Sequence, residues 1–432
     1  MNRILKISRT RTDYALVLLM ICVSGNPLFT DGRFDEAVLV TTAALAAAVL
    51  IRRRRLAITP ASVGVVLALT LILLVQGMLF AFLPVVTTGG FLIRLFIAYA
   101  TVRAVNRFPK VLVRVMCFLA VLSLCFYLID TALSLGGVSM RNWFSPPAVK
   151  RLCLIRYHII LHNFNFSEDS LPYRNAGLMW EPAAFAGYLL MAMILLGLDG
   201  EQAAHRRYKW ALVLLTLCVV TTQSTMAYLV LPFALGLHAA LWARRRHRLR
   251  PWPAAIGAVV LAAGVYLTWQ VDFVGRKTTK HYSQAVMKQR GWEINRFGSM
   301  LYDLEYIRRR PWMGWGIHKK TRRALNPGTE VDQSQGNGLS DFIAKFGFVG
   351  LMVFLWSVWR GLSGLSVRGG LPAAFAVVLL VVMLNGETFL NHPLFLSLMF
   401  LSEHRASRTL PRPAAAAAVV PVAHVVPNAG WY

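Results

Sequence analysis

The sequence is poor in acidic residues and in cysteine. It holds 19 Asp and Glu against 46 Lys and Arg, so its 432 residues carry a formal net charge of +27. Of five cysteines only Cys153 lies outside the apolar runs, which excludes an external disulfide framework, and no His/Cys spacing typical of a metal site occurs. A P-loop and a GxGxxG turn are also absent, so ATP-driven transport by this chain alone is not expected. We expect no metal and no other cofactor.

Long apolar runs dominate what is present. Most approach the roughly 20 residues that a helix needs to cross a bilayer, and a helix is the spanning form that satisfies its own backbone polar groups. The sequence therefore predicts an all-α, polytopic integral membrane protein with about 12 transmembrane helices. The runs cover 13–29, 37–51, 61–84, 91–107, 111–136, 178–198, 209–222, 226–243, 253–269, 339–359, 371–388 and 391–403.

Basic residues fall in every second gap between these runs, as at Arg52–Arg55 and Arg244–Arg250. The positive-inside rule then places both termini in the cytoplasm, and it explains the charge without a nucleic-acid partner. We expect one membrane domain over 1–404. The Pro/Ala-rich segment 405–432 predicts a disordered cytoplasmic tail.

Two predicted external loops are long, at about 138–176 and 270–338. The second carries thirteen Lys and Arg against six Asp and Glu. A cationic region beside a bilayer suits a phosphate, a pyrophosphate or a lipid headgroup, although attraction to anionic membrane lipids alone remains an alternative.

Candidate functional residues lie at the edges of both loops. Arg174 and Glu181 flank the mouth of the sixth run, and Pro182 predicts a helix start there, which favours the ionised carboxylate of Glu181. A capping carboxylate and a snorkelling arginine are the alternative. Apolar residues at helical spacing predict an external helix over about 297–309, with Arg296 at its entrance, where a guanidinium could bind phosphate. These apolar residues are Met300, Leu301, Leu304 and Ile307.

The order of RNAGLMWEP, TTQST, NRFGSM, RRRPWMGWG and GNGLSDFIAKFGFVG resembles the Wzy-type O-antigen polymerase and O-antigen ligase superfamily, over about 170–350. Arg296 stands fifteen residues before Pro311 of the PxxGxG turn, and Arg174 stands three before Gly177, as in that superfamily. The ligase histidine is missing, because Gly336 occupies its place before Asn337. The arginine that often follows the serine of the turn at Ser224 is missing too. With the Glu181–Pro182 pair, these departures favour a polymerase over a ligase.

The resemblance implies a periplasmic active site in the bacterial inner membrane. A hydroxyl of one lipid-linked repeat unit attacks the anomeric carbon of another, and the polyprenyl pyrophosphate leaves without help from a metal, with inversion. Donor and acceptor are then both polyprenyl-pyrophosphate-linked oligosaccharides, and a chain-length regulator is a further partner. The implied catalytic residues are Arg174, Glu181 as base and Arg296, and the implied substrate-binding residues are Arg276, Arg290 and Asn337.

A lipid-linked oligosaccharide flippase or other transporter is an alternative of another class. A transporter would be expected to show internal repeats and polar residues within its spans. We find no clear repeat, and the candidate intramembrane charges, Arg94, Asp341 and Lys345, all lie near the outer ends of their runs.

The charge pattern predicts the outcome of a topology experiment. A reporter that is active only outside the cytoplasm should be active when fused after residue 300 and silent when fused after Arg250. The reverse result would contradict the predicted orientation.

Overall fold

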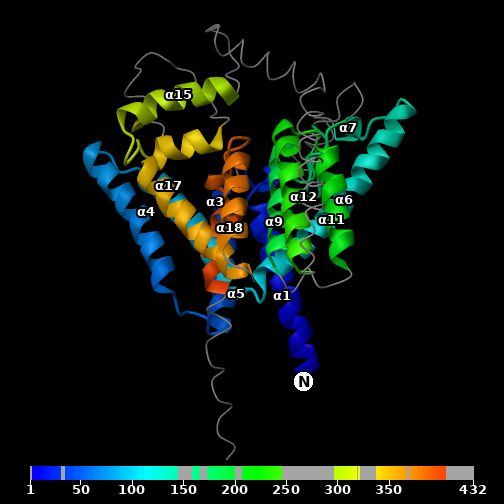
Figure 1. The fold of residues 1–432 in the computed structure, drawn as a ribbon, viewed down its shortest axis with the longest axis horizontal. Coiled ribbons are helices and arrows are strands. Elements are labelled where there is room, and N and C mark those ends of the chain that lie inside the picture. The colour runs from blue at the N-terminus through cyan, green and yellow to red at the C-terminus, as the bar shows by residue number, and fades with distance from the viewer. Residues whose placement is uncertain are drawn as a thin grey trace, which may run out of the picture.

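The computed structural model describes residues 2–30, 35–144, 158–165, 173–199, 207–245, 296–318, 320–321, 337–366 and 370–404. Helices dominate these ranges, and one short hairpin of β1 and β2 joins them (Figure 1). The elements are α1 (Asn2–Cys22), α2 (Pro27–Thr30), α3 (Asp35–Arg52), α4 (Pro60–Leu79), α5 (Val85–Ala104), α6 (Phe108–Leu135), α7 (Met140–Trp143), β1 (His158–Ile159), β2 (His162–Asn163), α9 (Pro182–Leu198), α11 (Arg207–Thr221), α12 (Thr225–Arg245), α15 (Arg296–Arg309), α17 (Gly338–Leu365), α18 (Gly370–Leu384), η1 (Phe389–Asn391), α19 (Pro393–Leu396) and η2 (Ser397–Phe400).

Five of the described helices are long and apolar enough to cross a membrane: α4, α5, α6, α12 and α17. Two shorter apolar helices, α9 and α18, accompany them. On α4, Leu67, Leu71 and Met78 are 62%, 59% and 81% exposed, which suits a helix whose outer face meets lipid rather than water. An all-α membrane protein is therefore confirmed, whereas the number of twelve spans is not. The predicted ninth run, 253–269, and the tail 405–432 lie outside the described residues.

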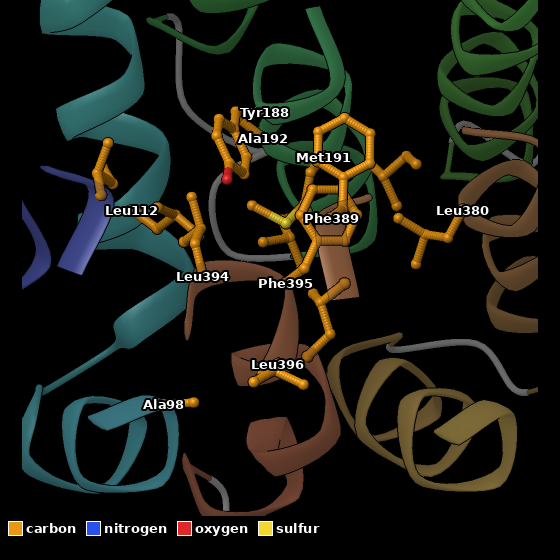
Figure 2. Packing of buried hydrophobic residues seen from close by; sticks show 14 of the residues in the cluster. Ala98, Leu112, Tyr188, Met191, Ala192, Leu380, Phe389, Leu394, Phe395 and Leu396 are labelled. Carbon is orange, nitrogen blue, oxygen red and sulfur yellow. The ribbon is translucent and has the colours of Figure 1, made fainter. Parts of the chain in front are cut away.

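Helix α9 is the centre of the bundle. Every residue from Pro182 to Leu198 is buried, because α6, α11, α12 and α18 pack around it. Figure 2 shows its Tyr188 and Met191 against Phe389 and Phe395, whose rings stack with centroids 4.3 Å apart. The segment after α18 therefore fills the core beside α9.

The prediction of a single spanning helix at 391–403 was wrong. The chain instead forms η1, then α19 and η2, and returns to α-helix only over 401–404. His392, in the extended conformation (φ −110°, ψ 137°), separates η1 from α19, and Pro393 cannot donate a backbone hydrogen bond to continue a helix. From Pro393 to His404 the helical turns are too short to cross a ~30 Å hydrocarbon layer.

The N-terminus lies at the lower end of the bundle (Figure 1), where a basic residue that follows α3 contacts the end of α5. Arg103 and Glu403 are 1% and 0% exposed and lie 3.4 Å apart, Nη1 to Oε2. Arg103 also donates to the Arg55 carbonyl at 3.3 Å, and Arg53 pairs with Asp13. The clusters at Arg52–Arg55 and at Arg103 thus meet at one end, as their alternation along the sequence predicts.

At the opposite, upper end the PxxGxG turn is inserted into a break in α17. The backbone of α17 is non-helical at Gly347 (φ 68°, ψ −176°). In an unbroken helix the amides of residues 348 and 349 would donate to the carbonyls of 344 and 345. Here the amides of 348 and 349 donate to the carbonyls of Pro311 and Trp312 at 2.7 and 3.2 Å. The carbonyls of 344 and 345 accept from the amides of Trp315 and Gly316 at 2.8 and 3.0 Å. The turn therefore satisfies these two amides and two carbonyls, which the break would otherwise leave unpaired.

The helix predicted over about 297–309 is confirmed as α15, which packs on α17. The predicted apolar face is only partly correct. Ile307 is buried, but Leu304 is 47% exposed, and Ser299, Asp303 and Tyr306 are buried instead. Asp303 accepts a hydrogen bond of 2.6 Å from Ser340 of α17, so a polar contact helps to set the rotation of the helix.

Replacing Gly347 with alanine should destabilise the protein. Its backbone conformation is essentially restricted to glycine, which costs other residues about 1–3 kcal/mol, and a Cβ there would lie 2.0 Å from the Trp312 carbonyl oxygen. Thermal unfolding of the purified protein in detergent should show a lower melting temperature. Gly64→Ala in α4, where a Cβ would meet nothing within 4 Å, is the matched control and should unfold no earlier than the wild type. Equal melting temperatures for the two variants would contradict this account of the break.

Candidate functional site at the upper end

Buried hydrogen bonds fix the segment that carries Arg174. The neighbouring Asn175 is fully buried; its Oδ1 accepts from Ser123 of α6 at 2.5 Å, and its Nδ2 donates to Thr221 of α11 at 2.9 Å. On the other side, Gln223 donates to the Tyr173 carbonyl at 3.0 Å. Arg174 is therefore held between two anchored residues, beside the turn that joins α11 to α12.

The same turn is where the resemblance leads us to expect an arginine that the sequence lacks. The hydrogen bond from Gln223 to the carbonyl of Tyr173 holds the neighbouring Arg174 next to Ser224 of this turn. A guanidinium is thus present beside this turn, although it comes from a different segment of the chain.

Glu181 and Pro182 start α9 as predicted. Glu181 is the N-cap residue, with extended backbone (φ −146°, ψ 151°), and Pro182 occupies the first turn. The Glu181 side chain makes no capping hydrogen bond, so the alternative of a capping carboxylate does not apply. Gly177, four residues earlier, has φ +54°, and a Cβ there would lie 2.7 Å from the Phe185 ring, so the segment turns tightly onto α9.

Asn337 lies at the start of α17 and is buried. Its Oδ1 accepts from the Ser340 amide at 3.1 Å as an N-cap, and its Nδ2 donates to Asn385 at 3.3 Å. The next residue, Gly338, packs so closely that a Cβ would lie 1.9 Å from the Glu387 carbonyl oxygen. Asn337 thus joins α17 to the connection that follows α18.

That connection, residues 385–392, brings the predicted site residues toward one another. It contacts Asn337 at one end, and at the other its His392 ring lies 4.8 Å from the Trp180 ring, next to Glu181. Between them, a Cβ on Gly386 would lie 2.9 Å from Met226, in the first turn of α12. The starts of α9, α12 and α17 therefore share one connecting segment.

The structure places only part of the predicted set. Arg296 is the first residue of α15, but its side chain lies outside the description, and so do Arg276 and Arg290. Arg174, Glu181 and Asn337 all lie at the upper end.

Two buried histidines near this site had no sequence signal. His158 and His162, in the hairpin of β1 and β2, are 0% and 3% exposed. Burial lowers the pKa of His158 to about 4 and that of His162 to about 3. Both rings are therefore neutral at neutral pH. The hairpin packs on the segment in front of α9, where Asn163 donates to the Met179 carbonyl at 2.8 Å.

Comparison with known proteins gives one match. Residues 210–355 match the family model described as O-antigen ligase. The match confirms the resemblance to the O-antigen ligase and polymerase superfamily, and it runs from α11 through the break in α17. No curated protein and no solved structure matches the chain.

Loss of the Asn175 amide should destabilise the upper end. Asn175→Ala would leave buried partners on α6 and α11 unsatisfied, at about 1–3 kcal/mol, so the melting temperature of the purified protein should fall. Asn142→Ala, at an exposed asparagine in α7, is the control and should change stability little. If both variants unfold like the wild type, Asn175 does not anchor the segment of Arg174.

Proposed function

We propose that this chain is a membrane glycosyltransferase that polymerises polyprenyl-pyrophosphate-linked oligosaccharide repeat units at the periplasmic face of the bacterial inner membrane. One observation carries the proposal: the region that matches the O-antigen ligase family contributes α11, α12, α15 and the first part of α17, and the segment of Arg174 docks against it. Arg174, held beside this region by its two neighbours, is a cation that suits a lipid-linked anionic substrate.

In the proposed reaction, a sugar hydroxyl of the acceptor attacks the anomeric carbon of the donor. A new C–O bond forms, the bond from that carbon to the pyrophosphate oxygen breaks, and its electron pair leaves with the pyrophosphate. Arg174 and Arg296 stabilise the charge on the leaving group, as preorganised cations do when they face developing charge. Arg276 and Arg290 bind the same group. A single displacement inverts the anomeric carbon.

We assign the proton of the attacking hydroxyl to Glu181. Its position at the start of α9 favours the ionised carboxylate, which can accept a proton but is a weak base. Asn337 is the proposed contact for a sugar hydroxyl. Its Oδ1 is committed to the cap of α17, so its Nδ2, whose bond to Asn385 is long at 3.3 Å, is the group that would donate to the sugar.

An O-antigen ligase is the second candidate, because the matching family carries that description. A ligase transfers the glycan to a lipid A-core acceptor, whereas a polymerase joins two lipid-linked repeat units. Purified protein with lipid-linked repeat units alone should therefore yield a ladder of products if the proposal is correct. Transfer that requires lipid A-core, with no ladder in its absence, would identify a ligase, and no new glycosidic bond under either condition would overturn both.

In the ladder assay, Arg174→Ala and Arg296→Ala should each slow polymerisation by about 10² to 10³, the usual loss when a donor that meets developing charge is removed. Lysine in place of either arginine keeps the charge but loses the planar fork, so it should restore the rate only in part.

The matched control is Arg309→Ala, on the exposed side of α15. Arg309 pairs with Glu305 at 2.9 Å, and the two side chains are 48% and 52% exposed. Arg310 is a poor control, because its guanidinium lies 4.5 Å from the Phe80 ring centroid and 4.8 Å from that of Trp315, and so helps to pack the loop onto α4. If Arg309→Ala slows the reaction as much as Arg174→Ala and Arg296→Ala, the basic residues act only through their summed charge. The specific roles of Arg174 and Arg296 would then be wrong.

A further inference from the structure

A second polar site lies on the other side of the connection 385–392. A cavity of about 290 Å³ is lined by Val23 just after α1, by residues of α2, α3, α5 and the first part of α17, by Ile317, and by the residue pair Asn391–His392. None of the predicted catalytic or substrate-binding residues lines it. Its volume is near the lower limit of ordinary small-molecule pockets, about 300 Å³, so it could hold a group the size of one sugar or one phosphate ester.

Cations outnumber anions on the wall of this cavity. Arg94 of α5 and Lys345 of α17 line it, with Asp35 as the lining carboxylate. Arg94 lies inside a helix long and apolar enough to span a membrane, where a charge is costly unless it is paired or meets water, and where such a residue often marks a substrate or ion pathway. Arg94 and Lys345 each have a carboxylate partner, Asp35 and Asp341, but their remaining N–H groups can donate to an anion in the cavity.

The Arg94 guanidinium keeps donors for such an anion. Its ion pair with Asp35 is 3.5 Å long, beyond ordinary hydrogen-bond length, and the two side chains are 29% and 31% exposed. A guanidinium has five N–H donors in a planar fork. Gly90, one turn earlier, leaves room for it, since a Cβ there would lie 3.4 Å from Nη1.

Lys345 and His392 complete the polar wall. Lys345 is held in place by its ion pair with Asp341, one turn earlier in α17. Burial, and to a smaller extent the charges of Arg94 and Lys345, lower the pKa of His392 to about 3, which leaves a neutral imidazole. Thr30 and Thr87 add hydroxyl groups to the lining.

We propose that this cavity binds a phosphate group, held between the guanidinium of Arg94 and the ammonium of Lys345, with Thr87 and His392 as neutral hydrogen-bonding partners. The donors come from several elements and suit the tetrahedrally arranged oxygens of a phosphate ester better than the coplanar oxygens of a carboxylate. The phosphate could belong to a sugar phosphate or to the headgroup of a membrane lipid. The site is separate from the proposed reaction, and its test requires no turnover.

The test is calorimetric titration of the full-length chain in nanodiscs of phosphatidylcholine with glucose 1-phosphate, glucuronate and glucose. Glucose 1-phosphate should bind, and Arg94→Gln should weaken it about tenfold to a hundredfold, because a charge-assisted, two-point contact is lost. Arg94→Lys should bind with intermediate affinity. Thr87→Val, which keeps the shape of the wall, should weaken binding only a few-fold.

Arg360→Gln, at an exposed arginine of α17 beyond the break, is the matched control and should bind like the wild type. Repeating the titration in nanodiscs that contain phosphatidylglycerol distinguishes the sources. If phosphatidylglycerol weakens the binding of glucose 1-phosphate to the wild type but not to Arg94→Gln, a lipid headgroup competes for the cavity. If phosphatidylglycerol leaves the binding of glucose 1-phosphate unchanged, the sugar phosphate is the occupant. Wild-type affinity in Arg94→Gln, or binding of glucuronate or glucose as tight as that of glucose 1-phosphate, would overturn the proposal.

Discussion

The upper end of the molecule depends on the exchange of main-chain hydrogen bonds between α17 and the PxxGxG turn. A helix in an apolar environment cannot leave backbone groups unsatisfied, so α17 can break at Gly347 only if another segment replaces the lost pairs. Residues 311–316 do so with two acceptors and two donors. Gln76 of α4 adds a side-chain donor to the Lys345 carbonyl at 2.8 Å. The first part of α17 is thereby fixed at an angle to the rest, and it carries Asn337 and Lys345 with it.

This exchange explains why the glycines of the turn are spaced as they are. Gly314 has φ +66°, and a Cβ there would lie 2.6 Å from the carbonyl carbon of Lys345; Gly316 has φ +88°. Each is needed where one backbone approaches another or turns left-handed. The PxxGxG spacing, which carries the family resemblance in the sequence, is thus needed for the turn to pair with the broken part of α17. The same turn follows α15 and helps to position that helix, independently of what the arginines of α15 do.

Features governed by local rules could be predicted from the sequence. Apolar length located the helices, Pro182 marked the start of α9, and Pro311 marked the end of the loop helix. Features set by distant partners could not. The rotation of α15 depends on Asp303 meeting Ser340, and the segment of Arg174 depends on Asn175 reaching α6 and α11. The last apolar run was predicted as a span because its composition is the same in a core segment as in a membrane helix.

The connection 385–392 gives the two polar regions of the upper end a common wall. On one side Asn385 holds Asn337, and on the other His392 lines the cavity with Arg94 and Lys345. Helix α17 also serves both, since Asn337 and Lys345 belong to its short first part, in front of the break. The break at Gly347 sets this part at an angle to the rest of α17, and the inserted turn holds it there. One helical segment in front of the break therefore supplies a side chain to each region, and the same four main-chain hydrogen bonds fix the position of both side chains.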